Sequence, residues 1–148
     1  MIILTNSGET IKTQTYNYSQ LSMSGTATVS ATTYTTIATA SYTPSSSSSY
    51  LWIEFSCTYE ISGTANDDFW SNIEVGGAEI INVKQAWANA SGGGTRSGVL
   101  FPLAGRYTNT GTSSLSITVR VKKGSSDDSA TVYGNSGSGL MRIQEIGR

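Results

Sequence analysis

Residues 50–61 alternate between apolar and polar side chains without interruption, and this pattern constrains the fold more than any other feature of the chain. One row is apolar and contains Leu51, Ile53, Phe55, Cys57, Tyr59 and Ile61. The other row is mostly polar and contains Trp52, Glu54, Ser56, Thr58 and Glu60. A period of two is typical of a β-strand with one face in the core and the other in water. The segment therefore predicts a half-buried strand.

The composition favours the same class of structure along the whole chain. The 148 residues include 24 serines and 20 threonines, and only 13% are charged. Residues that favour strands, such as Thr, Tyr, Val and Ile, outnumber the strong helix formers Lys, Glu and Gln. Strand patterns recur at intervals of about ten residues, separated by turns rich in Gly and Ser. We expect an all-β fold, an antiparallel β-sandwich that forms a jelly roll of about eight strands.

The charged and reactive residues exclude several classes of function. Nine Lys and Arg against ten Asp and Glu give a net charge of −1, so we expect no nucleic-acid partner. No apolar run reaches the roughly 18 residues of a membrane span, so we expect no membrane insertion. The absence of histidine excludes Ser-His-Asp and Cys-His catalysis and imidazole metal sites. We expect no enzyme activity, no cofactor and no metal, and a buried, inert thiol at the single cysteine, Cys57.

Residues 69–82 carry a hairpin signal centred on Gly76 and Gly77, which readily adopt the positive φ of a tight turn. A two-residue turn predicts three facing pairs, namely Val75 with Ala78, Ile73 with Ile80, and Glu74 with Glu79. Like charges directly opposite each other destabilise a ladder. We expect Glu74 and Glu79 to be solvated edge residues, with a shared cation as the alternative.

The remaining segments are assigned from composition. Further strands are expected around residues 34–42, 114–122, 130–133 and 140–146. The serine run at residues 45–49 is expected to be a flexible, solvated loop, and residues 84–98 are expected to break the strand pattern. Residues 99–103 are expected to form a short strand that lies at an edge or ends there, because they contain Pro102. Residues 105–111 are expected to form a connecting turn.

Residues 1–25 differ from the rest because their large side chains are sparse: Ile2, Ile3, Leu4, Tyr16, Tyr18, Leu21 and Met23. So little apolar surface cannot hold an extended chain in place by itself. The segment is either a first strand preceded by a loose tail or an arm that lies on a neighbouring subunit. We favour the arm, with these seven residues as interface candidates, and divide the chain into an N-terminal arm (1–25) and a jelly-roll domain (26–148).

The C-terminal third contains Gly-Arg-Tyr-Thr-Asn-Thr-Gly at 105–111, Leu-Ser-Ile-Thr-Val-Arg-Val at 115–121 and Leu-Met-Arg-Ile-Gln-Glu-Ile at 140–146. From residue 50 onward the chain resembles the jelly-roll proteins of tailed-bacteriophage virions, both capsid decoration (cement) proteins and tail-fibre tip domains. The resemblance implies a homotrimer. Fibre-tip domains usually follow a long fibrous shaft, whereas only about 25 residues precede the sandwich here.

Two hypotheses for function follow. The first is a capsid decoration protein, a homotrimer that binds the phage major capsid protein or other virion proteins on the exterior of the particle, after assembly in the host cytoplasm, and stabilises the shell. The alternative is a tail-fibre or receptor-binding tip that recognises a host surface glycan. Under that alternative Trp52, Trp70 and Trp87 are the glycan-binding candidates. Indoles that fill a subunit interface or cap the core are the competing interpretation.

Overall fold

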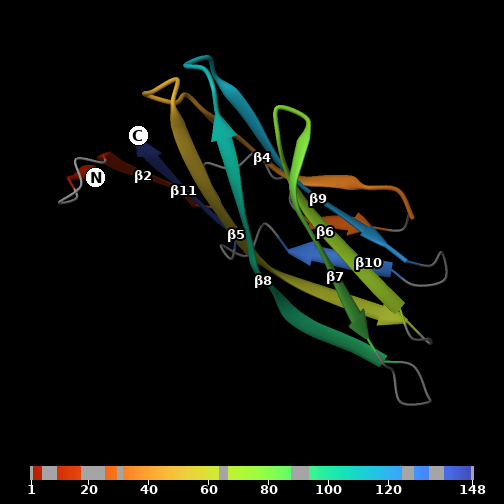
Figure 1. The fold of residues 1–148 in the computed structure, drawn as a ribbon. Helices are drawn as coiled ribbons and strands as arrows, with labels where there is room; N and C mark the ends of the chain where they lie inside the picture. Colours follow the sequence, from red (N-terminus) through yellow and green to blue (C-terminus); the bar gives the residue numbers. More distant parts are fainter. Residues whose placement is uncertain are drawn as a thin grey trace.

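The computed structural model describes residues 2–4, 10–17, 26–29, 32–63, 67–87, 94–124, 129–133 and 139–147. Every strand pair in these ranges is antiparallel, and the strands form two sheets with a shared apolar core (Figure 1). The antiparallel β-sandwich expected from the sequence is confirmed. Within the part of the chain that the structure describes, no helix is long and apolar enough to cross a membrane.

Within the described ranges, sheet A has seven strands: β1 (Ile2–Leu4), β2 (Thr10–Asn17), β3 (Thr26–Val29), β5 (Ser49–Gly63), β8 (Gly94–Asn109), β10 (Ser129–Tyr133) and β11 (Leu140–Gly147). In the same ranges, sheet B has four strands in the order β4-β9-β6-β7: β4 (Thr35–Tyr42), β6 (Asp67–Val75), β7 (Ala78–Trp87) and β9 (Leu115–Lys123).

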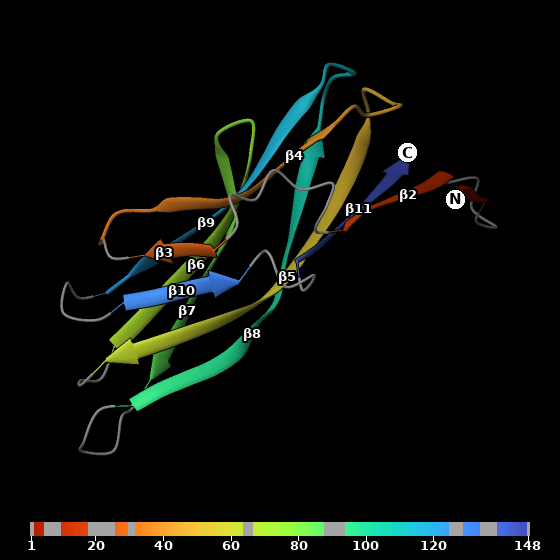
Figure 2. The same cartoon turned by 180° about the vertical axis from the view of Figure 1, so that it is seen from behind.

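The long strand β5 organises sheet A. It pairs with β8 over almost its full length, and its other edge is divided between β11, which pairs with residues 49–56, and β10, which pairs with residues 58–62. The sheet therefore branches: β11 continues to β2 and β1, whereas β10 continues to β3. Figure 2 shows the two branches diverging from β5.

Strand β8 is longer than the sequence suggested. Its register with β5 shifts between Phe55 and Cys57, and Pro102 lies within this irregularity, on a strand whose partner among the described strands is β5 alone, as suits a residue without an N–H. The edge position of Pro102 is therefore confirmed, but the short strand at 99–103 is part of one continuous strand. Residues 105–109, expected as a turn, also belong to β8, because the partner strand β5 holds them extended. Residues 84–87 and 94–98 likewise lie in strands β7 and β8.

The core is formed by the inward rows of both sheets. From β5 the buried residues are Leu51, Ile53, Phe55 and Cys57, as the alternation predicted. Sheet B contributes the buried side chains Ile37, Ala38, Ala40, Tyr42, Phe69, Ile73, Val75, Ile117, Val119 and Val121. Burial raises the pKa of the Cys57 thiol to about 12, so this cysteine is protonated and unreactive near neutral pH.

The β6–β7 hairpin forms where it was expected. Gly76 and Gly77 have φ angles of 58° and 85°, the left-handed region that a tight hairpin turn requires. The pairs Val75 with Ala78 and Glu74 with Glu79 are confirmed. The prediction that Ile73 faces Ile80 is wrong, because a register shift after Ile73 places it opposite Ile81.

Strand β7 also packs against β8, so that the two sheets approach each other closely along this side. A Cβ atom at Gly105 would lie only 2.9 Å from Cδ1 of Ile80 and 3.2 Å from Cγ2 of Ile81. Any larger residue at this position would force the side chains of Ile80 and Ile81 to move. Gly105 is therefore a packing residue of the sandwich, rather than a turn residue.

The serine run is held in place by a buried carboxylate of β11. Glu145 is 2% exposed. It accepts hydrogen bonds of 2.7 to 3.0 Å from the Tyr42 hydroxyl, the Ser45 amide and hydroxyl, the Ser46 amide and the Ser49 hydroxyl. Burial raises the pKa of the Glu145 carboxyl, but the hydrogen bonds outweigh it, and the pKa lies below its ordinary value of 4.5.

An amide on β8 completes this cluster. The side-chain nitrogen of Asn109 donates to the Ser46 carbonyl at 2.6 Å, to the Ser49 hydroxyl at 3.2 Å and to the Gly111 carbonyl at 2.7 Å. The segment is a loop between β4 and β5 in which Ser45, Ser47 and Ser48 are exposed, as expected, but the expectation that it is flexible is wrong. The reason is that its partners come from strands about 60 and 100 residues away in sequence, which the serine run does not reveal.

The N-terminal segment lies at the end of one branch of sheet A. Strand β2 pairs with β11, from Asn17 opposite Leu140 to Ile11 opposite Ile146, and β1 pairs with β2. Residues 10–17 thus form a strand of their own chain's sheet, as in the first of the two interpretations. A contact of residues 1–25 with a neighbouring subunit stays a prediction, as does the division of the chain at residue 25.

Candidate functional site

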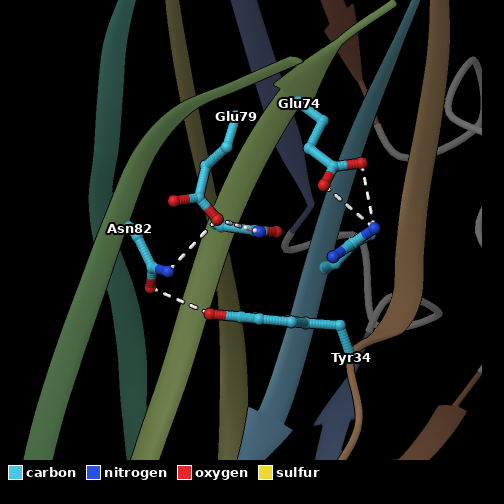
Figure 3. Close-up of polar contacts among 6 residues, drawn as sticks. Tyr34, Glu74, Glu79 and Asn82 are labelled. Carbon is cyan, nitrogen blue, oxygen red and sulfur yellow. Dashed lines mark hydrogen bonds and ion pairs between the residues drawn. The ribbon is translucent and has the colours of Figure 1, made fainter. Parts of the chain in front are cut away.

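Two solvent-facing surfaces carry aromatic and charged side chains, one on each sheet. The surface of sheet B carries Tyr34, Glu74, Glu79 and Asn82 (Figure 3), and with Arg120 and the buried Asn72 these residues are called here the B-face cluster. These residues come together because alternate positions of β6, β7 and β9 point away from the core, and Tyr34 reaches over them from the start of β4.

The two facing glutamates of the hairpin have separate partners. Glu74 forms an ion pair with Arg120 on β9, with a shortest N–O distance of 2.9 Å. Glu79 instead accepts hydrogen bonds from the side-chain amides of Asn72 at 2.7 Å and Asn82 at 3.1 Å. The expectation that both are solvated edge residues is wrong for Glu74, because β6 lies between β7 and β9. The cationic side chain of Arg120 lies beside the two carboxylates, but it pairs with Glu74, whereas Glu79 is bound by amides.

Tyr34 covers the centre of this cluster. Its hydroxyl donates to Asn82 Oδ1 at 2.9 Å. Its ring centroid lies 4.8 Å from the Arg120 guanidinium and 4.7 Å from Lys122 Nζ. Burial raises the pKa of the Tyr34 phenol, and the hydrogen bond with Asn82 only partly offsets this, so Tyr34 is a neutral donor.

Trp70 extends the same surface, but cations already approach its ring. The Nζ atoms of Lys84 and Lys122 lie 5.4 and 5.3 Å from the ring centroid of this half-buried side chain. A sugar ring that stacked on Trp70 would first have to displace a lysine. Trp87 is the last residue of β7, and its side chain lies outside the described residues, so its glycan-binding role stays a prediction.

The second surface, called here the A-face platform, consists of Trp52, Glu54, Arg106 and Arg142. Trp52 lies on the polar row of β5, as predicted, and is 38% exposed. Its Nε1 donates to Glu54 Oε1 at 3.1 Å, and Glu54 also accepts from Nε of Arg142 on β11 at 2.7 Å. Arg106 on β8 lies directly opposite Trp52.

The rings of the two surfaces differ in accessibility. Among the described residues, a cation lies over Tyr34, Tyr42, Tyr50 and Trp70, and none lies over Trp52. The indole of Trp52 is therefore the open aromatic surface among these rings. It can stack on an apolar face of a ligand while its N–H remains satisfied by Glu54.

Within the described ranges, no group of three or more acidic, cysteine or histidine side chains is placed to hold a metal ion. The interface candidates Ile2, Ile3, Leu4 and Tyr16 lie in β1 and β2, but their side chains fall outside the description. Tyr18, Leu21 and Met23 lie outside the described residues altogether. Their role at an interface stays a prediction.

Sequence reasoning missed several residues of both surfaces. Arg106 was assigned to a turn, and Arg142 was noted only as part of the closing strand. Arg120 lies in the strand expected at residues 114–122, but its pairing with Glu74 depends on β6 and β9 being neighbours. The like-charge pair of glutamates was the available signal, because it required a nearby compensating group.

Comparisons of the sequence with protein-family models and with curated proteins find no match. A solved structure described as dimeric latent PorU from Porphyromonas gingivalis overlaps 93% of this chain and 13% of its own, at 10% identity and a TM-score of 0.45. A chain of the T13 viral particle of infectious bursal disease virus (IBDV) overlaps 91% of this chain and 35% of its own length, at 10% identity and a TM-score of 0.46.

A third structure, described as the EclA C-terminal domain, a sugar-binding protein, overlaps 91% of this chain and 78% of its own, at 15% identity and a TM-score of 0.31. The chain spans about a third of the IBDV capsid chains and a much smaller part of PorU. Overlap at this level carries no argument about the function of the chain.

Proposed function

We propose that the chain is a non-enzymatic structural protein of a virion, and more specifically a capsid decoration (cement) protein of a tailed bacteriophage. In this role a homotrimer binds the major capsid protein or other virion proteins on the exterior of the head. The bound trimers stabilise the shell by bridging neighbouring capsid subunits, and repetition over the shell supplies avidity even when each interface is modest.

The position of the N-terminal segment carries this proposal. Strand β2 adds to β11, and β1 adds to β2, so residues of the expected arm form the outermost strands of one branch of sheet A. The outer edge of β1 has no partner strand within the described residues. The free backbone groups of an edge strand can pair with another chain, so this edge is suited to a contact with a neighbouring protein.

The test compares the full chain with a variant that lacks residues 1–9. This deletion removes β1 and leaves β2 on β11. We expect the urea midpoint of unfolding to change little, while co-sedimentation with undecorated capsids is lost. Thr112→Ala, in the exposed turn between β8 and β9, is the matched control and keeps full binding. Undiminished capsid binding by the truncated protein would contradict the role of the arm.

A second measurement separates decoration from a tail location. Quantitative mass spectrometry of purified particles gives the copy number of the chain relative to the major capsid protein. We expect a ratio close to one decoration subunit per capsid subunit. A copy number that matches a tail appendage instead would reject the decoration function.

The open indole of Trp52 favours a second candidate function, a tail-fibre or receptor-binding tip that recognises a host surface glycan. Exposed tryptophans can stack on the apolar faces of sugar rings, and Trp52 is 38% exposed with no cation over its ring among the described residues. A glycan array tests this function. Specific binding that Trp52→Ala abolishes and Trp70→Ala leaves unchanged would support it.

A further inference from the structure

The A-face platform combines an open aromatic ring with a guanidinium that has no carboxylate partner in the described part of the chain. Trp52 on β5 is flanked by Arg106 on β8 and by Gln144 on β11, directly opposite in both ladders. Side chains at directly opposite positions have Cβ atoms about 5 Å apart, so they form one continuous surface.

The indole is held in one orientation from its edge. Its N–H donates to Glu54 Oε1 at 3.1 Å, and Arg142 holds the other oxygen of that carboxylate through its Nε at 2.7 Å and through a second contact from Nη2. Because these contacts lie at the edge of the ring, its faces stay available. A preorganised ring loses little conformational entropy when a ligand stacks on it.

The charge of the platform comes from Arg106. Glu54 is neutralised by Arg142, whereas the exposed guanidinium of Arg106 contacts the ring of Tyr50, with 4.8 Å to the centroid, and forms no ion pair with any described residue. Stacking on Tyr50 orients the guanidinium without using its hydrogen-bond donors in a salt bridge. A planar guanidinium with free donors is the protein group that best matches a carboxylate.

We propose that the A-face platform binds a saccharide that carries a carboxylate, of the uronic-acid type. The apolar face of the pyranose ring stacks on Trp52, and its carboxylate pairs with Arg106. A neutral sugar would leave Arg106 unused, while a nucleic acid would meet too little positive charge in a chain with a net charge of −1. This inference rests on glycan recognition, the second candidate function, and is independent of decoration.

The experiment uses the variant Trp70→Phe/Trp87→Phe, in which Trp52 is the sole tryptophan. Its fluorescence is titrated with an oligomer of a hexuronic acid and, as the neutral match, with the methyl-esterified oligomer. We expect a saturable change with the acidic oligomer and an affinity roughly fivefold weaker for the ester, as for one exposed ion pair. Added salt should weaken binding of the acidic oligomer and leave binding of the ester unchanged.

Two substitutions in the otherwise native chain assign the residues by calorimetry. Trp52→Ala is expected to lower the affinity at least about tenfold, as loss of a stacked ring does. Arg106→Gln is expected to abolish the preference for the acidic oligomer while keeping the weaker, neutral-type affinity. Lys122→Gln, on the other sheet, is the matched control with unchanged affinity, and thermal melting of each variant confirms folding.

Different outcomes overturn different statements. Glycan binding that is insensitive to Trp52→Ala and Arg106→Gln would overturn the site but leave glycan recognition standing. Equal affinity for the acidic and the esterified oligomer would overturn the assigned ligand class. No binding to either oligomer, with Trp52 fluorescence resistant to a soluble quencher, would overturn the proposal in favour of a face covered by a second copy of the chain.

Discussion

Two clusters in the molecule are built around carboxylates, and they differ in which parts of the chain the carboxylates connect by hydrogen bonds and ion pairs. Glu145 is buried, and its oxygens accept hydrogen bonds from five donors on the serine run and on Tyr42 of the facing sheet. Glu74 and Glu79 lie on the outer face of sheet B and bind side chains of adjacent strands. The first cluster orders a loop, whereas the second adds to strands that are already paired. Removing the carboxylate of the first cluster should therefore lower the free energy of unfolding more than removing a carboxylate of the second.

The largest effect is expected for Glu145→Ala. This substitution leaves donors of Ser45, Ser46 and Ser49 without their acceptor, and unsatisfied donors near the interior cost about 1–3 kcal/mol each before water compensates. We expect the free energy of unfolding in urea to fall by about 2–4 kcal/mol. Glu79→Gln is the surface control and should lose less than about 1 kcal/mol. Similar losses for both variants would break the distinction between the clusters.

The acid dependence of stability sharpens the same distinction. Because the folded-state pKa of Glu145 lies below its ordinary value of 4.5, the unfolded chain binds a proton more readily. Its contribution to stability is therefore complete above that ordinary value and is lost as the pH falls through the lower folded-state pKa. We expect Glu145→Gln to reduce the loss of unfolding free energy that urea titrations measure as the pH falls from about 6 to about 3. An unchanged slope would show that other groups govern it.

A smaller effect is expected for the ion pair on the outer face. Glu74→Gln removes the partner of Arg120, whose side chain is 29% exposed, and should lower the free energy of unfolding by roughly 1 kcal/mol. A double-mutant cycle with Arg120→Gln isolates the pair, with an expected coupling of about 0.5–1 kcal/mol. A coupling above that of a surface pair would place this cluster in the same class as Glu145.

The smallest effect is expected for Tyr34→Phe. The substitution removes the hydroxyl that donates to Asn82 and keeps the ring that contacts Arg120 and Lys122. An exposed hydrogen bond of this kind contributes about 0.5 kcal/mol, which a careful urea titration can resolve. Tyr34→Ala, which also removes the ring, should lose more. Equal losses for the two variants would show that the ring contacts contribute nothing.

The fold could be predicted wherever local patterning decides it. The alternation that begins at Leu51 and the paired glycines of the hairpin both reflect short-range geometry, and both were assigned correctly. The register at Ile73 and the extended state of Gly105 were not, because a bulge and a partner strand decide them. Gly105 is typical of a turn by residue type, and only the nearby Ile80 explains why it lies in a strand.

The candidate site was predictable only in part for the same reason. The exposure of Trp52 follows from its place on the polar row of one strand. The lysines over Trp70 come from two neighbouring strands, so the sequence does not distinguish its covered ring from the open ring of Trp52. The place of Arg106 on this surface could be predicted only if residues 105–109 were recognised as part of a strand. Sequence thus indicated which rings leave the core, but not which of them stay open.

The pairing of β2 with β11 has a consequence for how the protein folds during synthesis. Strand β2 is synthesised long before β11, with which it pairs, and β11 also supplies Glu145 to the serine run. Until β11 is made, β2 and one edge of β5 have no partner there, and such edges are prone to pair with other chains. Contacts this distant in sequence slow folding. Completion of this branch of the sheet therefore waits until β11 has been synthesised.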